Sequence, residues 1–165
     1  MTESLLSIAF QKKATAVAVF HGLRIEYLDV HHASATGTKA VQSVYQFLSR
    51  TIVAFSCTSV ALELVDNDGT GRALLFEGVL ARLRNDGIPV FTFSQAEILP
   101  AFSLPPLRTM AELRALGLSL MPMLTDSASQ ETIDAALIGL LMQVDREIRS
   151  IFNLDHSRTP NARTP

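Results

Sequence analysis

The first thirty residues alternate between short apolar runs and brief polar breaks. Two lysines at 12–13 separate the apolar residues 5–10 from the apolar residues 14–20. Gly22 marks a second break, and residues 23–30 then alternate with a period closer to about 2 than to 3.6. Short apolar runs joined by such brief turns are typical of hairpins. We therefore expect three antiparallel strands at the start of the chain.

The middle of the chain changes to helical spacing. From Thr38, a residue type that caps helices, to about Phe55, apolar side chains recur at intervals of three and four. Residues 59–65 form a brief apolar run that we interpret as a central strand. A polar loop over 66–71 follows, and a second helix is expected over 72–85.

A fifth strand is expected over residues 88–93, with Phe91 and Phe93 on one face as core residues. Residues 94–106 contain three prolines and are expected to be irregular. Thr109 and Glu112 then have the spacing of a capping box, which predicts a short helix.

The last periodic segment predicts a long helix. Ser127 and Gln130 make a second capping box, and the apolar stripe continues to about Phe152. Residues 153–165 carry no core-forming pattern and are expected to be a flexible tail. We expect one domain over residues 1–152.

Composition agrees with a single globular domain. The chain has 165 residues, of which 48% are hydrophobic and 18% are charged, so it can form a substantial core. No apolar run is long enough to span a bilayer, and we expect a cytoplasmic protein with no membrane partner. Cys57 is the single cysteine, which excludes an internal disulfide framework, and we expect a buried thiol.

The charge balance bears on nucleic-acid binding. The formal net charge is −2 and the pI is about 6.1, whereas strong nucleic-acid binders usually carry a basic excess. A local basic patch is still compatible with these values, because the distribution of charge matters more than its sum. The candidate residues for contacting a substrate are Lys12, Lys13 and Arg72, with Lys39 nearby.

Three acidic residues and one alanine carry a resemblance to a known family. Residues 4–22 form an apolar hairpin, Glu63 lies in an apolar strand, and Glu131 and Asp134 are three apart at the start of the last helix. In order and spacing these features resemble the RuvC-like branch of the RNase H-like superfamily, over roughly residues 4–145. The resemblance implies an α/β fold, with a mixed five-stranded sheet of three antiparallel strands, then parallel strands, flanked by helices.

The resemblance also implies a chemistry. Such enzymes hold magnesium with a carboxylate cluster and cut phosphodiesters. Glu63, Glu131 and Asp134 would be the residual catalytic and metal-binding cluster. The family usually has an aspartate at the end of its first strand, where this chain has Ala9. A methyl group supplies no oxygen to a hard cation, so no cofactor or only weakly bound Mg²⁺ is expected.

Three functional hypotheses follow. The first is a catalytically degenerate RuvC-like domain that acts as a nucleic-acid-binding or assembly module, with branched or structured nucleic acid and a second copy of the chain as partners. The second is an active metal-dependent nuclease similar to Holliday junction resolvases, in which Asp29 or Asp66 replaces the missing ligand. The third is a protein-interaction module without nucleic-acid function. The sequence does not decide whether the chain is an enzyme.

A separate pattern in the 66–71 loop is typical of a calcium site. Asp66, Asp68, Thr70 and Glu77 occupy the first, third, fifth and twelfth positions of an EF-hand loop, and a glycine occupies the sixth. The segment before this loop is predicted to be a strand rather than a helix. The alternative is a polar strand-to-helix turn whose acids cap the helix.

Overall fold

The computed structural model describes residues 3–101, 108–124 and 129–151. Along the chain the elements are β1 (Ser4–Phe10), β2 (Ala14–His21), β3 (Arg24–His32), α1 (Gly37–Ala54), β4 (Cys57–Glu63), α2 (Gly71–Asn85), β5 (Val90–Phe93), α3 (Gln95–Ala101), α4 (Met110–Leu120) and α5 (Gln130–Ile151). The predicted tail over 153–165 and the predicted cap Ser127 lie outside the described residues.

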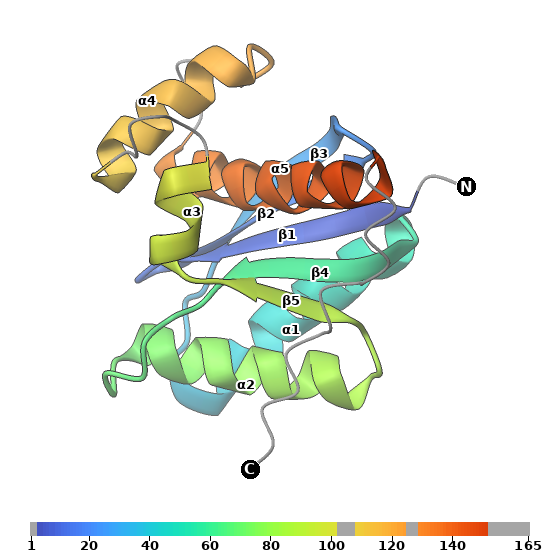
Figure 1. The fold of residues 1–165 in the computed structure, drawn as a ribbon. Coiled ribbons are helices and arrows are strands. Elements are labelled where there is room, and N and C mark those ends of the chain that lie inside the picture. The colour runs from blue at the N-terminus through green and yellow to red at the C-terminus, as the bar shows by residue number, and fades with distance from the viewer. Residues whose placement is uncertain (1–2, 102–107, 125–128, 152–165) are drawn as a thin grey trace.

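The strands form one five-stranded sheet in the order β3-β2-β1-β4-β5. β2 runs antiparallel to β1 and to β3, whereas β4 pairs with β1, and β5 with β4, in parallel. The parallel pairs need crossovers, and α1 and α2 are parts of these connections (Figure 1). This arrangement confirms the predicted fold class: a mixed sheet, flanked by helices, of the RNase H-like type.

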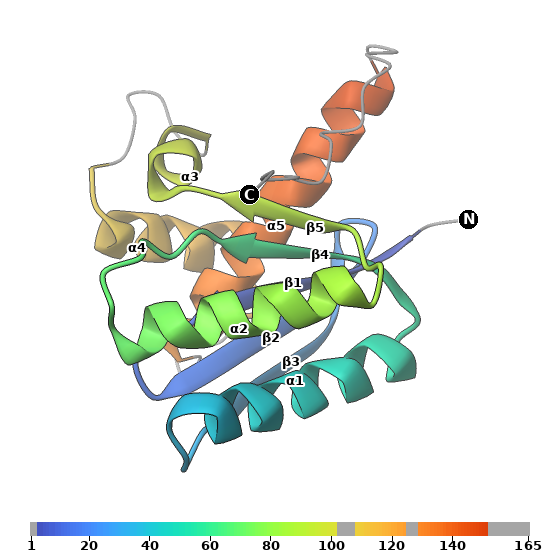
Figure 2. The same cartoon turned by 90° about the horizontal axis from the view of Figure 1, so that it is seen from below.

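Helices cover both faces of the sheet. α3, α4 and α5 lie on one side and α1 and α2 on the other (Figures 1 and 2). Strand side chains alternate between the two layers, so Ala9 packs in the α5 layer and its neighbours Ile8 and Phe10 pack in the layer of α1 and α2. Because β1, β2 and β4 are covered on both faces, they are apolar almost throughout.

α5 lies very close to the sheet because the residues between them are small. A Cβ atom added at Gly139 would be 2.1 Å from the Phe20 ring. The Ser7 hydroxyl, on β1, donates to the carbonyl oxygen of Ala135 on α5 at 2.6 Å and contacts that of Ala18 at 3.1 Å. These contacts hold α5 against β1 and β2.

Three element predictions need correction. Residues 95–101, predicted to be irregular, form α3, because Glu97 accepts hydrogen bonds from Ser94 and Ile98 is fully buried, which together outweigh Pro100. α1 begins at Gly37 rather than after Thr38. β4 spans Cys57–Glu63, two residues earlier than predicted.

Other predictions at the level of elements are confirmed. Thr109 and Glu112 form the reciprocal capping box at the start of α4. Phe91 and Phe93 are both buried in the α5 layer. Burial raises the pKa of the Cys57 thiol to about 11, and this cysteine is a free, buried thiol.

No helix in the described ranges has both the length and the apolar character needed to cross a bilayer.

Candidate functional site

The carboxyl ends of β1 and β4 meet the start of α5, and this junction is the candidate site. Ile8 pairs with Leu62, so Ala9 and Glu63 follow at neighbouring positions of the two strands. Ala9 is fully buried in the layer that faces α5. Asp134, in the first turns of α5, is also buried, with 1% of the residue exposed.

Asp134 has both carboxylate oxygens occupied by side chains of this chain. Arg114, on α4, donates from Nε to Oδ1 and from Nη2 to Oδ2, both at 2.7 Å. Gln11, in the turn between β1 and β2, donates from Nε2 to Oδ2 at 3.0 Å. A bidentate guanidinium pair is the strongest common contact of a carboxylate. Asp134 is therefore neutralised and fixed without any cation from solution.

Glu63 has a weaker cationic partner. Its Oε2 lies 3.7 Å from Nη2 of Arg72, and 13% of the Glu63 side chain is exposed. Arg72 is itself positioned by a hydrogen bond from its Nε to the carbonyl oxygen of Phe10 at 2.6 Å. The contact to Glu63 is an ion pair that is too long for a hydrogen bond.

The charge environment shows that these groups share one site. Burial raises the pKa of Glu63, and the negative charges of Asp134 and Asp66 raise it further, whereas Arg72 and Arg114 lower it. Arg114 has a raised pKa, mainly because it donates to Asp134, with further contributions from Glu63 and Glu131. Glu63, Asp134 and the two arginines therefore act on one another electrostatically.

The predicted cluster is thus brought together only in part. Glu63 and Asp134 lie in the same site next to Ala9, and the half-buried Glu131 adds its charge on the Arg114 side. Among the residues that the structure describes, no three His, Cys, Asp or Glu side chains are grouped closely enough to hold a metal ion. Arginine side chains face the carboxylates instead.

Sequence reasoning missed Gln11 and Arg114. Their contacts with Asp134 join residues 123 and 20 positions apart, which no local pattern reveals. One signal was present: Arg114 stands between Leu113 and Leu116 in a short apolar helix. A cation in such a segment needs a partner when the helix packs against the core.

Neither predicted substitute ligand has the required position. Asp29 lies on the opposite face of the sheet from Glu63, since its neighbour Tyr27 packs in the layer of α1. The Asp29 carboxylate accepts hydrogen bonds from the Tyr27 hydroxyl at 2.6 Å and from the Val30 amide at 2.8 Å. Asp66 is exposed in the loop after β4, and it acts on Glu63 only through its charge.

The loop over 66–71 has the geometry of a helix cap. A strand precedes it, so the flanks are not the two helices of an EF-hand. The Asp68 carboxylate accepts from the Thr70 amide at 2.9 Å, and the Thr70 hydroxyl accepts from the Ala73 amide at 3.3 Å. Glu77 is exposed on α2. These contacts form the polar strand-to-helix turn of the alternative, but the helix is capped by the Thr70 hydroxyl rather than by an acid.

The predicted basic patch divides into two parts. Lys12 and Lys13 are exposed in the turn between β1 and β2, and Lys39 is exposed in the first turn of α1. Arg72, by contrast, is directed toward Glu63 and the end of β1. The arginine is therefore part of the carboxylate site rather than of an open cationic surface.

Comparisons with known proteins agree with this architecture. No protein-family model and no curated protein matches the sequence. Among solved structures, Thermus thermophilus RuvC in complex with a Holliday junction substrate has a TM-score of 0.70 at 14% identity, with 88% of this chain and 96% of that chain covered.

Two further solved structures are similar. The fowlpox virus resolvase, solved with Holliday junction DNA, has a TM-score of 0.61 at 12% identity and covers 87% of this chain and 98% of its own. The yeast mitochondrial Holliday junction resolvase has a TM-score of 0.59 at 12% identity and covers 92% of this chain and 85% of its own. The chain therefore has the RuvC-like, RNase H-like fold of these resolvases.

Proposed function

We propose that this chain is a RuvC-like domain that binds branched or structured nucleic acid without cutting it. The observation that supports this proposal best is the pairing of Asp134 with Arg114 and Gln11 at the carboxyl end of β1. Two guanidinium groups face the two acids, Glu63 and Asp134, that resemble catalytic carboxylates.

The coordination chemistry of magnesium explains why this arrangement disfavours cleavage. Mg²⁺ requires near-octahedral oxygen ligands, and a two-metal nuclease site needs several carboxylates close together. Ala9 supplies a methyl group at the position where the resemblance places an aspartate. To bind a metal, Asp134 would first have to lose its bidentate ion pair with Arg114. The Asp134 side chain is only 1% exposed, so water could not replace that partner. Losing such a pair is costly.

The fold and one cationic turn support a nucleic-acid partner. Two of the similar resolvase structures were solved with Holliday junction DNA. Lys12 and Lys13 are exposed in the turn that follows β1, one position after Gln11 of the candidate site. With a net charge of −2, we expect weak, salt-dependent binding, because phosphate neutralisation supplies most of the affinity.

The test is a titration of a four-way junction and a plain duplex at two salt concentrations, with magnesium present, followed by analysis of the DNA for cleavage. We expect the protein to bind the junction more tightly than the duplex, and both more tightly at the lower salt concentration. The junction should remain uncut. Lys12→Ala/Lys13→Ala should weaken binding and flatten its salt dependence, by about 0.9 in log–log slope for each phosphate that the protein no longer neutralises. The matched control is Lys39→Ala, which removes the remaining lysine of the chain.

Two outcomes would contradict the proposal. Metal-dependent cleavage that Glu63→Gln abolishes would assign an active nuclease. Failure to bind either DNA at low salt would favour the protein-interaction alternative.

A further inference from the structure

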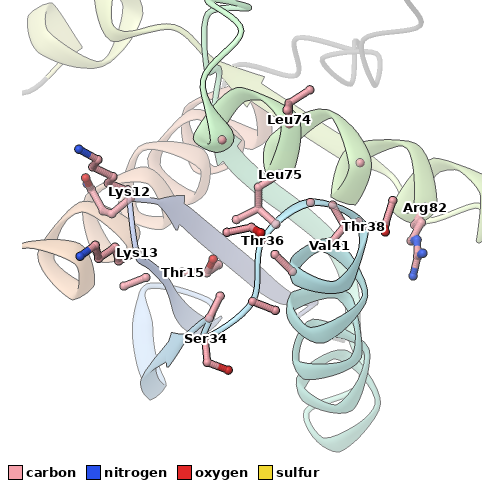
Figure 3. Close-up of a pocket in the computed structure, with 18 of the residues that line it drawn as sticks. Lys12, Lys13, Thr15, Ser34, Thr36, Thr38, Val41, Leu74, Leu75 and Arg82 are labelled. Carbon is pink, nitrogen blue, oxygen red and sulfur yellow. The ribbon is translucent and has the colours of Figure 1, made fainter.

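A groove on the other side of the sheet joins Lys12 and Lys13 to an apolar wall that the proposed function does not use. It lies between α1, α2 and the turn after β1, and it has a volume of about 880 Å³ (Figure 3). This size falls within the range of small-molecule sites. α1 and α2 cover the face opposite α5, and the groove shares one residue, Gln11, with the site of Glu63 and Asp134.

The wall of the groove is aliphatic. Val41 and Leu75 lie at its centre, between the two helices (Figure 3), and the remaining apolar lining is Leu74 with several alanines and glycines. No aromatic side chain is among the lining residues, all of which belong to the described part of the chain. The groove therefore offers hydrophobic contact to a saturated chain but no stacking surface for a nucleobase.

The charged lining residues are all cationic. Lys12 and Lys13 lie at one end of the groove and Arg82 at the other (Figure 3), and no Asp or Glu belongs to this described lining. The chain as a whole has 16 acidic and 14 basic residues, so a lining without acids departs from the average surface. Complementarity of charge thus favours a ligand with an anionic group.

The Thr15 hydroxyl marks where that anionic group would bind. The Thr15 residue is 1% exposed, and its side chain lines the groove near the lysines. Because a hydroxyl can donate a hydrogen bond, it can pair with an anionic acceptor of a ligand in the groove.

The start of α1 lies in the same lining and favours the same charge. Thr36 is the N-cap residue, its side chain makes no capping hydrogen bond, and the first turn contains no acidic residue. The amide groups of this turn are uncapped by a side chain, and the positive end of the helix dipole faces the groove.

We propose that this groove binds a small anionic amphiphile, with its phosphate or carboxylate head near Thr15 and the two lysines and its aliphatic chain along Val41 and Leu75. The head would accept from the Thr15 hydroxyl and pair with Lys12 or Lys13. The aliphatic tail of the ligand would be covered by the aliphatic wall of the groove. A purely ionic ligand would leave that wall in contact with water. Lys12 and Lys13 also belong to the proposed nucleic-acid contact, so junction DNA should compete with the amphiphile for these lysines, whereas Thr15 and the aliphatic wall would contact the amphiphile alone.

The test is isothermal titration calorimetry of the full chain with octyl phosphate, below its micelle concentration. Inorganic phosphate lacks the tail and octanol lacks the head, and we expect each to bind at least about tenfold more weakly than octyl phosphate. Equal binding of inorganic phosphate and octyl phosphate would overturn the proposal, because the aliphatic wall would then contribute nothing. Retention on anionic vesicles that octyl phosphate does not displace would also overturn it, by assigning a membrane surface.

Three variants connect the binding to these residues. Thr15→Val keeps the shape of the side chain and removes the hydroxyl, so octyl phosphate should bind about tenfold more weakly. Lys12→Ala/Lys13→Ala should also weaken binding, whereas Lys39→Ala, outside the lining, should not. Unchanged affinity for octyl phosphate in Thr15→Val would reject the amphiphile site. The same variant should leave junction binding unchanged, which separates this proposal from the proposed function.

Discussion

At the scale of single residues, Asp134 carries a charge into the interior of the protein. Its two oxygens accept from Arg114 at 2.7 Å each, while the Arg114 side chain remains 24% exposed. Such a pair contributes little by its mere presence, because both groups lose water. Removing one partner is different, since the other is left without its counter-charge.

Asp134→Asn should therefore lower the free energy of unfolding by about 2–3 kcal/mol, somewhat less than for a fully buried pair because Arg114 reaches solvent. The matched control lies on the same helix. Asp145 pairs with Arg149 at 2.9 Å on the surface, and Asp145→Asn should cost at most about 0.5 kcal/mol. Urea denaturation measures both values, and equal losses would contradict the structural importance of the Arg114 pair.

Glu63 should make stability depend on pH. Its pKa is raised above 4.5 by burial, so the folded protein holds this proton more tightly than the unfolded chain does. The resulting stabilisation is complete below the unfolded pKa and is lost as the pH rises through the folded pKa. Glu63→Gln does not titrate, so its stability relative to wild type should increase between about pH 4.5 and pH 7.

Denaturation of both proteins at these two pH values measures the change. Glu77→Gln, at an exposed position on α2, is the control variant for the loss of one carboxylate. A difference for Glu63→Gln that falls with rising pH would show that Arg72 outweighs burial, and a constant difference would show that the two effects on the Glu63 pKa cancel.

At the scale of elements, the contact of α5 with the sheet depends on Gly139. Alanine favours a helix by about 1 kcal/mol over glycine, but a Cβ here would be 2.1 Å from Phe20 and 2.8 Å from the Ser7 hydroxyl. Gly139→Ala should therefore destabilise the protein by about 2 kcal/mol. Gly71→Ala, at the start of α2, has no atom within 4 Å of the new Cβ and should be neutral or stabilising by about 0.5 kcal/mol.

Thermal or urea unfolding of the two alanine variants distinguishes these effects. A stabilised Gly139→Ala protein would mean that α5 can move away from the sheet without loss.

The elements also show which parts of the fold were predictable. The strands and the main helices follow from local apolar periodicity, which decides whether a segment buries one face or both. α3 was missed because Pro100 argued against a helix, whereas the burial of Ile98 is a tertiary effect. Glu63 and Asp134 follow from their order and spacing, and pairing of Glu63 with an arginine was one reading of an acid in an apolar strand. Arg114 was not predictable, because its contact with Asp134 joins two separate helices.

At the scale of the whole molecule, each of the two acids beside Ala9 has a cationic partner from this chain. Arg72 pairs with Glu63 and Arg114 with Asp134, while Glu131 and Asp66 add further negative charge at the edges of the site. Magnesium would have to displace a guanidinium group to reach either carboxylate, so millimolar magnesium should leave the stability of the wild-type protein unchanged. A further carboxylate at the end of β1 would have no such partner.

Ala9→Asp supplies that carboxylate. In the absence of metal we expect a loss of several kcal/mol, because Ala9 is fully buried beside two other acids. Magnesium should restore part of it, by about 2.7 kcal/mol at a hundredfold excess over Kd if the metal binds only the folded protein. Ala16→Asp is the matched control, since Ala16 is the partner of Ala9 on β2, is equally buried and faces the same layer, but lies one strand farther from Glu63.

Unfolding of the two aspartate variants, titrated with magnesium, decides between two descriptions of the site. If magnesium restores the stability of Ala9→Asp but not of Ala16→Asp, the fold still places its carboxylates to bind a metal, and the metal displaces the arginines. If both variants responded alike, the arrangement of Glu63 and Asp134 would be only an ion-pair network of the core. Stabilisation of the wild-type protein by magnesium would instead contradict this pairing, because the two guanidinium groups would then not occupy the place of the cation.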